Sequence, residues 1–273
     1  MRRTPFYKMS GSGNDFVMLD GRQSPVAQWS AGRIRAVCDR RMGVGADGLV
    51  VLTAEGPDVV RMHFWNCDGS PAAMCGNAAL CSTRLAALLG LGQPEGMTLI
   101  TGAGRFRTRS EAGPDQAALN LPPIELPQAM SAISLGPGEL ALHLSTVGVP
   151  HLVLEVEDLE AIDLMGRGRE LRHHPEIGPG GANVNFVSLN PPGSPVGIRT
   201  YERGVEGETL ACGTGTVAAG VVLALGGRVT LPTEFRTRSG RPLRVSARLQ
   251  TDSAVDLWLG GEGRLVFEGA WPD

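Results

Sequence analysis

Two cysteines occupy the same place in two similar stretches of sequence. Cys75 lies in FWNCDGSPAAMCGNAALCSTRLAALLG and Cys212 lies in TYERGVEGETLACGTGTVAAGVVLALGG, 137 positions further on (212 − 75). Each is followed by a glycine and then by an apolar run. A thiol and its thiolate can release and take up a proton. Two such groups, one from each half of a chain, suit a reaction that removes a proton from one face of a carbon and returns one on the other.

The offset of 137 recurs in other segments, which indicates a duplicated half. It relates Phe64 to Tyr201, Gly90 to Gly227, Asn14 to His151, and GVGADGLVVL from Gly43 to GGANVNFVSL from Gly180.

The elements around each cysteine follow one plan. Alternating residues in VVRMHFW and VGIRTYE predict a strand before each cysteine. The pairs Gly76-Asn77 and Gly213-Thr214 predict the start of a helix. The segments AALCSTRLAALL and GTVAAGVVLALG are apolar almost all round, so each helix should be buried inside a curled sheet. We therefore predict an α+β fold, with the Pro-rich segment 120–130 crossing between the halves.

The backbone N–H groups at the start of each predicted helix should contribute more to the reaction than the helix dipole contributes through the pKa of the thiol. A cysteine has an ordinary pKa of about 8.5, and a helix dipole contributes about 0.3–1 kcal/mol at an exposed site. That is less than one pKa unit. A backbone N–H that stabilises a developing negative charge is worth about 2.7–4 kcal/mol of barrier. We expect the helix starts to act mainly as binding sites for a substrate carboxylate.

Composition excludes several classes of protein. The chain has 273 residues, a formal net charge of −3, 38 glycines and 19 prolines. This charge gives no basic surface for nucleic acid, and the glycine and proline content predicts many turns and short strands. The first residues carry no secretory signal, and no apolar run is long enough to span a membrane. We expect a cytoplasmic protein with a small-molecule partner, no nucleic acid and no membrane.

Cysteine usage points to reduced thiols. The five cysteines (38, 67, 75, 81 and 212) form no CxxC pair, and the gaps between Cys67, Cys75 and Cys81 match no common zinc spacing. We predict no metal site, and we interpret Cys38 and Cys81 as packing residues. A thiol redox protein or a metal-binding protein remains an alternative.

No cofactor is expected from the sequence. Pyridoxal phosphate racemases use a lysine Schiff base, and the one lysine, Lys8, lies in a strand-like context. Neither a Walker A nor a Rossmann fingerprint is present. The pattern favours acid–base chemistry by side chains alone.

The motif series KMSGSGNDFVMLD, GVGADGLVV, FWNCDGSPAAMCGN, GVPHLV, NVNFV and ERGVEGETLACGTGT resembles the diaminopimelate epimerase family across essentially the whole chain. The resemblance implies two pseudo-symmetric halves, each a curled β-sheet or barrel around a buried helix, with the active site in the cleft between them. We place the halves at residues 1–121 plus 263–273 and at residues 122–262. It also implies cofactor-independent epimerisation of LL- to meso-2,6-diaminopimelate, for lysine and peptidoglycan precursors, by a homodimer.

The resemblance implies a role for each matching residue. Cys75 and Cys212 would be the acid/base pair, His151 and Glu202 would orient or pair with the α-amino group, and Arg203 would grip the distal carboxylate. The other expected substrate-binding residues are Asn14, Asn66, Gly76, Asn77, Asn183, Gly213 and Thr214.

Some positions depart from the family pattern. Val149 replaces a common asparagine, Gly48 stands where some members have glutamine, and Ala78 and Leu80 change the segment after the first CGN. None alters the thiols, but the first two bear on recognition of the distal end. A related racemase or epimerase of another amino acid, such as histidine or hydroxyproline, is therefore an alternative. Arg203 favours a substrate with a second carboxylate.

Overall fold

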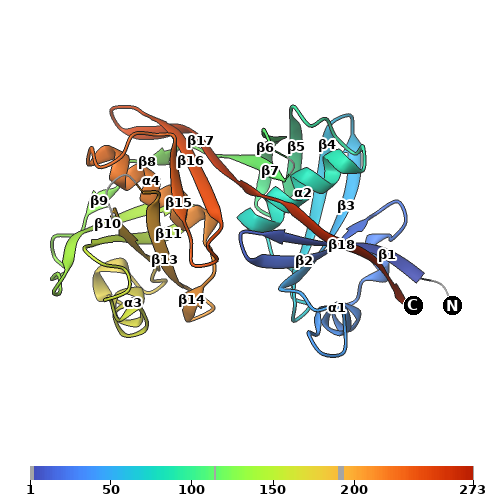
Figure 1. The fold of residues 1–273 in the computed structure, drawn as a ribbon, viewed down its shortest axis with the longest axis horizontal. Helices are drawn as coiled ribbons and strands as arrows, with labels where there is room; N and C mark the ends of the chain where they lie inside the picture. The colour runs from blue at the N-terminus through green and yellow to red at the C-terminus, as the bar shows by residue number, and fades with distance from the viewer. Residues whose placement is uncertain (1–2, 114, 190–193, 273) are drawn as a thin grey trace. The chain divides into compact units, whose positions relative to one another are not determined.

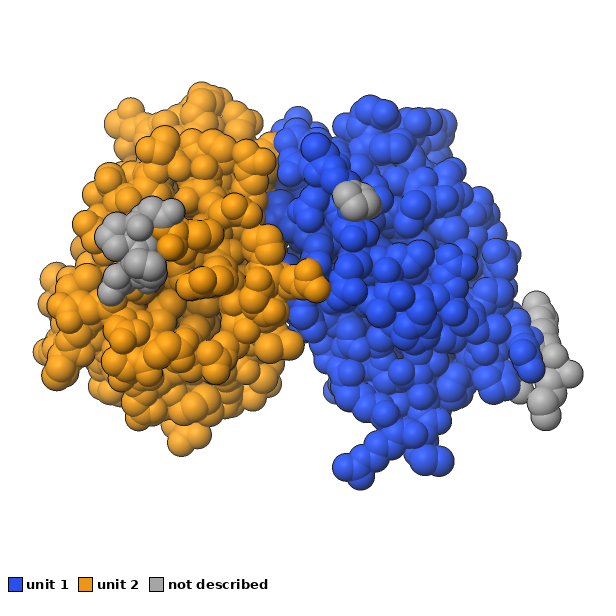
Figure 2. Space-filling model, in the orientation of Figure 1, with its two compact units in different colours: residues 1–120, 260–273 blue, residues 121–259 orange. Residues whose placement is uncertain are grey.

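The chain forms two compact units in a computed structural model that describes residues 3–113, 115–189 and 194–272. The first unit comprises residues 1–120 and 260–273, and the second comprises residues 121–259 (Figure 2). In the described part of the chain, none of the helices is both long and apolar enough to cross a membrane.

In its described residues the first unit is a mixed sheet with two α-helices and one 3-10 turn. Figure 1 labels its strands and α-helices. In chain order its elements are β1 (Arg3–Gly11), β2 (Asn14–Asp20), η1 (Val26–Gln28), α1 (Ala31–Cys38), β3 (Gly48–Gly56), β4 (Val59–Asn66), α2 (Gly76–Leu88), β5 (Met97–Thr101), β6 (Gly104–Ser110), β7 (Gln116–Leu121), whose last residue belongs to the second unit, and β18 (Arg264–Pro272). The strands pair in the order β18, β1, β2, β3, β4, β5, β6, β7. Only β2 with β3 and β4 with β5 are parallel among these pairs.

Helix α2 is the buried centre of the first unit. It packs against β1 to β6 and β18, and it begins at Gly76 with nine of its 13 residues buried. On the other side of β2 and β3, helix α1 packs its Ile34 and Val37 against Val17 and Leu49. Because β2 and β3 are covered on both faces, the central residues of both strands are almost all apolar.

The second unit repeats this plan. In chain order its elements are β8 (Ile124–Glu125), β9 (Gln128–Ala129), β10 (Glu139–Val147), β11 (Val149–Val156), α3 (Leu164–Arg172), η2 (Pro175–Ile177), β12 (Asn183–Ser188), β13 (Val196–Glu202), β14 (Gly207–Thr209), α4 (Gly213–Leu225), β15 (Thr233–Arg236), β16 (Pro242–Leu249) and β17 (Ser253–Glu262), whose last three residues belong to the first unit. Among the described residues, β11 with β12 and β13 with β15 pair in parallel. Helix α4 packs against β10, β11, β12 and β16, and ten of its 13 residues are buried.

The structure confirms the predicted α+β class, the strands before each cysteine and the two buried helices after them. Helices α2 and α4 begin and end 137 positions apart, and the parallel ladders keep the same offset, since Phe16 pairs with Gly48 and Val153 pairs with Asn185.

The predicted equivalence of Phe64 and Tyr201 is wrong by three residues. Phe64 pairs with Val50, whereas Val187, the residue 137 positions after Val50, pairs with Ile198. The β3–β4 hairpin is three residues longer than the β12–β13 hairpin. The connection to the central helix is three residues longer in the second unit, where it contains β14. The two differences cancel, so the cysteine keeps its place at the start of each helix.

Candidate active site

Cys75 and Cys212 are the N-cap residues of α2 and α4. Both have extended backbone angles, and the carbonyl of each accepts the first helical hydrogen bond, at 2.9 Å. Helices α1 and α3 have side-chain caps from Ser30 and Asp163. By contrast, neither α2 nor α4 has a side-chain cap among the described residues. Their first-turn N–H groups are therefore available to a ligand.

The surroundings of Cys212 are tightly packed. Cys212 is 8% exposed, and its Sγ lies 3.8 Å from Thr214 Oγ1. Gly215 faces the same space, because a Cβ at this position would lie 3.2 Å from the Cys212 Sγ. The residue is thus held by the first turn of its own helix.

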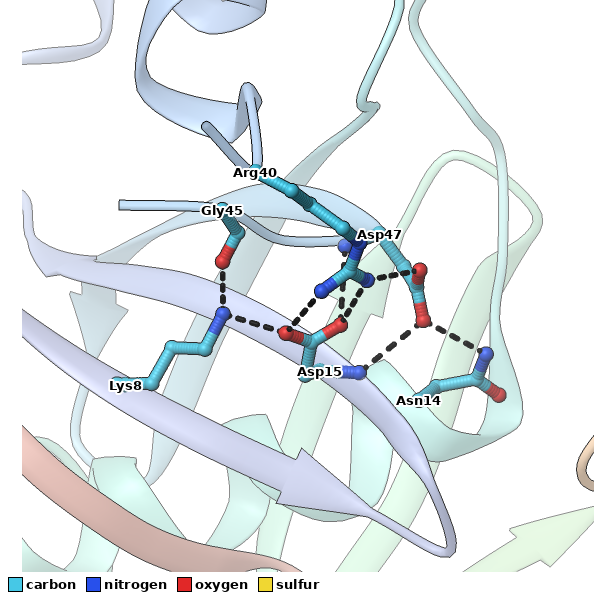
Figure 3. Close-up of polar contacts among 6 residues, drawn as sticks. All are labelled: Lys8, Asn14, Asp15, Arg40, Gly45 and Asp47. Atoms are coloured by element: carbon cyan, nitrogen blue, oxygen red, sulfur yellow. Dashed lines mark hydrogen bonds and ion pairs between the residues drawn. The ribbon is translucent and has the colours of Figure 1, made fainter. Parts of the chain in front are cut away.

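At the start of α2, a chain of side-chain amides leads back into the sheet. The nearly buried Asn77 donates from Nδ2 to Asn14 Oδ1 at 2.7 Å, and Asn14 donates from its own Nδ2 to Asp47 Oδ2 at 3.1 Å. Figure 3 shows the Asn14 end of this chain. The contacts fix which end of the Asn14 amide faces α2, and they leave one N–H and one lone pair for a ligand.

A cluster of two cations and two carboxylates holds Asp47 in place (Figure 3). Arg40 donates to Asp15 Oδ1 at 2.6 Å and to Asp47 Oδ1 at 2.7 Å. Lys8 donates to Asp15 at 2.5 Å and to the carbonyl of Gly45. Burial on its own would raise the pKa of Asp15, but hydrogen bonds from Arg40 and Lys8 outweigh it, so the pKa lies below its ordinary value.

In the second unit, His151 is enclosed by amides. It is fully buried on β11, and its Nδ1 lies 3.3 Å from Asn185 Nδ2 and 3.5 Å from Asn183 Nδ2. Burial, followed by the charge of Arg203, lowers the pKa of His151 to about 3. The imidazole is therefore neutral at ordinary pH, which favours orienting a substrate over an ion pair.

Glu202 is the last residue of strand β13, and Arg203 follows it directly. Burial raises the pKa of Glu202. The backbone N–H of Arg203 donates to Asn183 Oδ1 at 2.8 Å, and its guanidinium reaches the carbonyl of Gly180 at 3.4 Å. Nearby, Arg199 is paired with Glu208 at 2.7 Å. Among the described residues Arg203 makes no ion pair with a carboxylate.

Three predicted positions lie apart from these contacts. Asn66 is exposed and donates to Ser70 Oγ at 3.1 Å. Val149 is partly buried at the start of β11. A Cβ at Gly48 would lie 2.6 Å from Phe64 Cε2, so in this chain a side chain at position 48 would meet that ring.

The structure therefore gathers most of the predicted residues near two helix starts. Cys75, Gly76, Asn77 and Asn14 meet at the start of α2. Cys212, Gly213 and Thr214 form the start of α4. Asn185, whose Oδ1 lies against Gly215 of that turn, connects it to His151, which lies beside Asn183, and Arg203 is bonded to Asn183.

Sequence reasoning missed the residues that hold the predicted site residues in place through hydrogen bonds and ion pairs. These are Lys8, Asp15, Arg40, Asp47 and Asn185. One signal was present, because strand alternation in NVNFV places residues 183 and 185 on the same face.

The remaining cysteines lie elsewhere. Cys38 and Cys81 are buried, as predicted, and burial raises the pKa of Cys38 to about 12. Cys67 is exposed. Within residues 3–113, 115–189 and 194–272, no group of three His, Cys, Asp or Glu side chains is placed to hold a metal ion.

Solved structures of low sequence identity define the class of fold. A PhzF-family phenazine biosynthesis protein from Bacillus anthracis superposes with a TM-score of 0.75 at 13% identity, covering 100% of both chains. A hydroxyproline epimerase from Agrobacterium vitis superposes with a TM-score of 0.67 at 20% identity, covering 99% of this chain and 92% of that one. The fold is therefore the α+β architecture of two pseudo-symmetric halves that these proteins share.

Sequence comparison is more specific. The family model described as diaminopimelate epimerase matches residues 6–112 and 144–253. The diaminopimelate epimerase of Gemmatimonas aurantiaca is 46% identical over 97% of this chain and 98% of its own length. That of Chlorobaculum tepidum is 38% identical over 96% and 98%. The chain belongs to the diaminopimelate epimerase family, and it is an isomerase.

Proposed function

We propose that this protein epimerises LL-2,6-diaminopimelate to meso-2,6-diaminopimelate without a cofactor, and that Cys75 and Cys212 are its two acid/base groups. One observation supports the assignment of the thiols above the others. Each unit places a cysteine, not an ordinary capping residue, at the start of its buried central helix. Family membership supports the substrate.

The proposed reaction moves one proton in each direction. The thiolate of one cysteine takes the α-proton, and the electron pair left on the carbon delocalises into the α-carboxylate. The thiol of the other cysteine then delivers its proton to the opposite face, which inverts the centre and leaves that cysteine as the thiolate. No oxidant or reductant is consumed, and the two cysteines exchange roles for the reverse reaction.

Stabilisation of the intermediate is the larger requirement. The N–H groups of Gly76, Asn77, Gly213 and Thr214 are proposed to hold the α-carboxylate, where negative charge grows as the proton leaves. Each well-placed donor is worth about 2.7–4 kcal/mol. The helix dipole contributes about 0.3–1 kcal/mol to a thiolate, so the donors matter more than any dipole effect on the pKa of the thiols.

The ends of the substrate have proposed partners in both units. Arg203 is proposed to bind the distal carboxylate, which is supported by its lack of a carboxylate partner among the described residues. The partly buried Glu202 is proposed to bind the α-amino group. Asn14, Asn66 and Asn183 are proposed to hydrogen-bond the far end.

We further infer a cytoplasmic homodimer with an amino-acid substrate and a place in lysine and peptidoglycan precursor synthesis. Family membership supports these statements. Light scattering on the purified protein measures the oligomeric state directly.

The test is to offer the protein LL-diaminopimelate, L-histidine and trans-4-hydroxy-L-proline and to follow the chirality of each. We expect inversion of diaminopimelate. Inversion of another amino acid with diaminopimelate left unchanged would contradict the substrate assignment and favour the alternative raised by Val149.

The two thiols are tested by substitution. In Cys75→Ser and Cys212→Ser we expect turnover to fall by about 10²- to 10⁴-fold, the usual contribution of a general acid or base. Circular dichroism and thermal unfolding check that each variant folds, and Cys38→Ser serves as a matched cysteine control. Near-normal turnover in either variant would disprove its role as a base.

A further inference from the structure

The buried amide of Asn185 has a fixed orientation. Asn185 is fully buried on β12. Its Nδ2 donates to the carbonyl of Leu152 at 2.9 Å, and its Oδ1 accepts from Thr200 Oγ1 at 3.0 Å. A backbone carbonyl can only accept, so the nitrogen end of the amide must face Leu152. That same nitrogen lies 3.3 Å from His151 Nδ1.

This orientation determines where His151 carries its proton. An amide nitrogen only donates, so the His151 Nδ1 that faces it must be the unprotonated, accepting nitrogen. The Nδ2 of Asn183, at 3.5 Å, approaches the same ring nitrogen and imposes the same requirement. The proton of the neutral ring is therefore on Nε2.

The Nε2 atom of His151 is a buried donor in need of an acceptor. Among the described residues nothing accepts a hydrogen bond from it, although the ring is fully buried. Buried polar groups in native proteins almost always have a partner. The position is close to the proposed reaction, because the Oδ1 of Asn185 lies against the first turn of α4, where a Cβ on Gly215 would overlap it.

We propose that Asn185 is a positioning residue that holds His151 as the neutral Nε2–H tautomer, so that His151 donates a hydrogen bond to a carboxylate oxygen of the bound substrate. The assignment of the tautomer does not depend on which reaction the protein catalyses. Only the identity of the acceptor, a substrate carboxylate, rests on the proposed function. A ring that donates from Nε2 cannot also accept a hydrogen bond from a substrate ammonium at that nitrogen. His151 therefore does not bind the α-amino group, which is the role proposed for Glu202.

The electrostatics agree with this assignment. Burial and the charge of Arg203 lower the pKa of His151 to about 3. Both oppose the imidazolium form, in which Nδ1 would carry a proton facing the Asn185 N–H.

Nitrogen NMR of the intact protein labelled with ¹⁵N-histidine tests the tautomer. The chain has five histidines, and the signals absent from His151→Gln identify His151. Couplings to the two ring C–H groups tell Nδ1 from Nε2. We expect Nε2 protonated and Nδ1 unprotonated at every pH between about 5.5 and 8.5. A protonated Nδ1, or a ring that titrates in this range, would overturn the proposal.

Variants of Asn185 and its partner separate positioning from packing. In Asn185→Asp the donor becomes an acceptor, so we expect Nδ1 to become protonated and kcat/KM to fall by about tenfold to a hundredfold, the value of one hydrogen bond to a charged group. Thr200→Val removes only the hydrogen bond to Asn185 Oδ1, and we expect His151 to keep its Nε2 proton. An unchanged tautomer in a folded Asn185→Asp variant would contradict the positioning role.

The acceptor is tested in Cys75→Ser, in which turnover is slowed. On adding LL-diaminopimelate we expect the His151 Nε2–H signal to shift, while Nδ1 stays unprotonated. Binding of diaminopimelate without a change at Nε2 would reject the contact with substrate. A protein that keeps the tautomer but epimerises no diaminopimelate would refute the proposed function and leave the Asn185 assignment standing.

Discussion

The neutral imidazole of His151 links the stability of the protein to pH. Burial lowers the pKa of His151 in the folded state to about 3, whereas a histidine in an unfolded chain has a pKa near 6.5. Below about pH 6.5 the unfolded chain therefore binds a proton that the folded chain does not. The stabilising contribution of the neutral ring is fully present above about pH 6.5 and is lost as the pH falls toward 3.

We predict that this one residue lowers the free energy of unfolding by up to about 1.4 kcal/mol for each pH unit below 6.5. Denaturant unfolding of the wild type and of His151→Gln at pH 7.5, 6.5, 5.5 and 4.5 measures the effect, and the variant should have the shallower slope. His173→Gln, at an exposed position, is the matched control and should keep the wild-type slope. Equal slopes for the wild type and His151→Gln would contradict a buried, neutral ring.

At the scale of elements, the close approach of α4 to β12 depends on Gly215. In a helix interior, alanine is more favourable than glycine by about 0.8–1.0 kcal/mol. A Cβ at Gly215 would overlap Asn185 Oδ1 and crowd the Cys212 Sγ at 3.2 Å, and overpacking typically costs about 1–3 kcal/mol. The cost of this overlap is larger than the gain in helix propensity, so Gly215→Ala should destabilise the protein.

Gly32 in α1 supplies the matched control for this prediction. The nearest atoms to a Cβ there are 3.9 and 4.0 Å away, so Gly32→Ala should stabilise the protein by up to about 1 kcal/mol. Thermal and denaturant unfolding of both variants check the opposite signs. Stabilisation by Gly215→Ala would show that α4 does not pack as closely as we describe.

Much of the element plan could be predicted from the sequence, because it rests on local patterns. The apolar runs after Cys75 and Cys212 and the Gly-Asn and Gly-Thr starts indicate buried helices and their first residues, and both helices formed as expected. The register of β4 was missed by three residues because hairpin and loop lengths compensate along the chain, which no local pattern reveals.

The residues that hold the site in place could not be predicted from local sequence patterns, because they are far from their partners in the sequence. Arg40 and Asp15 are 25 positions apart and meet only once β2, β3 and the loop after α1 are folded. The contact of Asn185 with His151 spans 34 positions and depends on the parallel ladder of β11 and β12. Motifs located the residues that we propose to react, whereas the residues that hold them in place could be found only from the tertiary structure.

At the scale of the whole molecule, the C-terminal strand completes the first unit. β18 pairs with β1 from Arg3 to Ser10, and Phe267 meets Phe6 edge to face at 6.0 Å between ring centroids. The chain thus returns from the second unit to the start of the first one. The sheet of the first unit therefore contains strands from both ends of the sequence.

Removing residues 264–273 should therefore loosen the first unit. We predict faster amide hydrogen exchange in β1 of the truncated protein, because its partner strand is lost. The amides of β11 and β12 belong to the second unit and serve as the internal control. Unchanged protection of β1 after truncation would contradict the pairing of the two ends of the chain.

The central claim is that one thiol removes the α-proton and another delivers its replacement. The most direct measurement is epimerisation of LL-diaminopimelate in D₂O, stopped early, with deuterium located in the product and in the recovered substrate. We predict that meso-diaminopimelate carries one solvent deuterium at the inverted carbon while the remaining LL substrate is unlabelled. A product that retains the substrate's own hydrogen at that carbon would mean that a single group acts on both faces, and the account would fail.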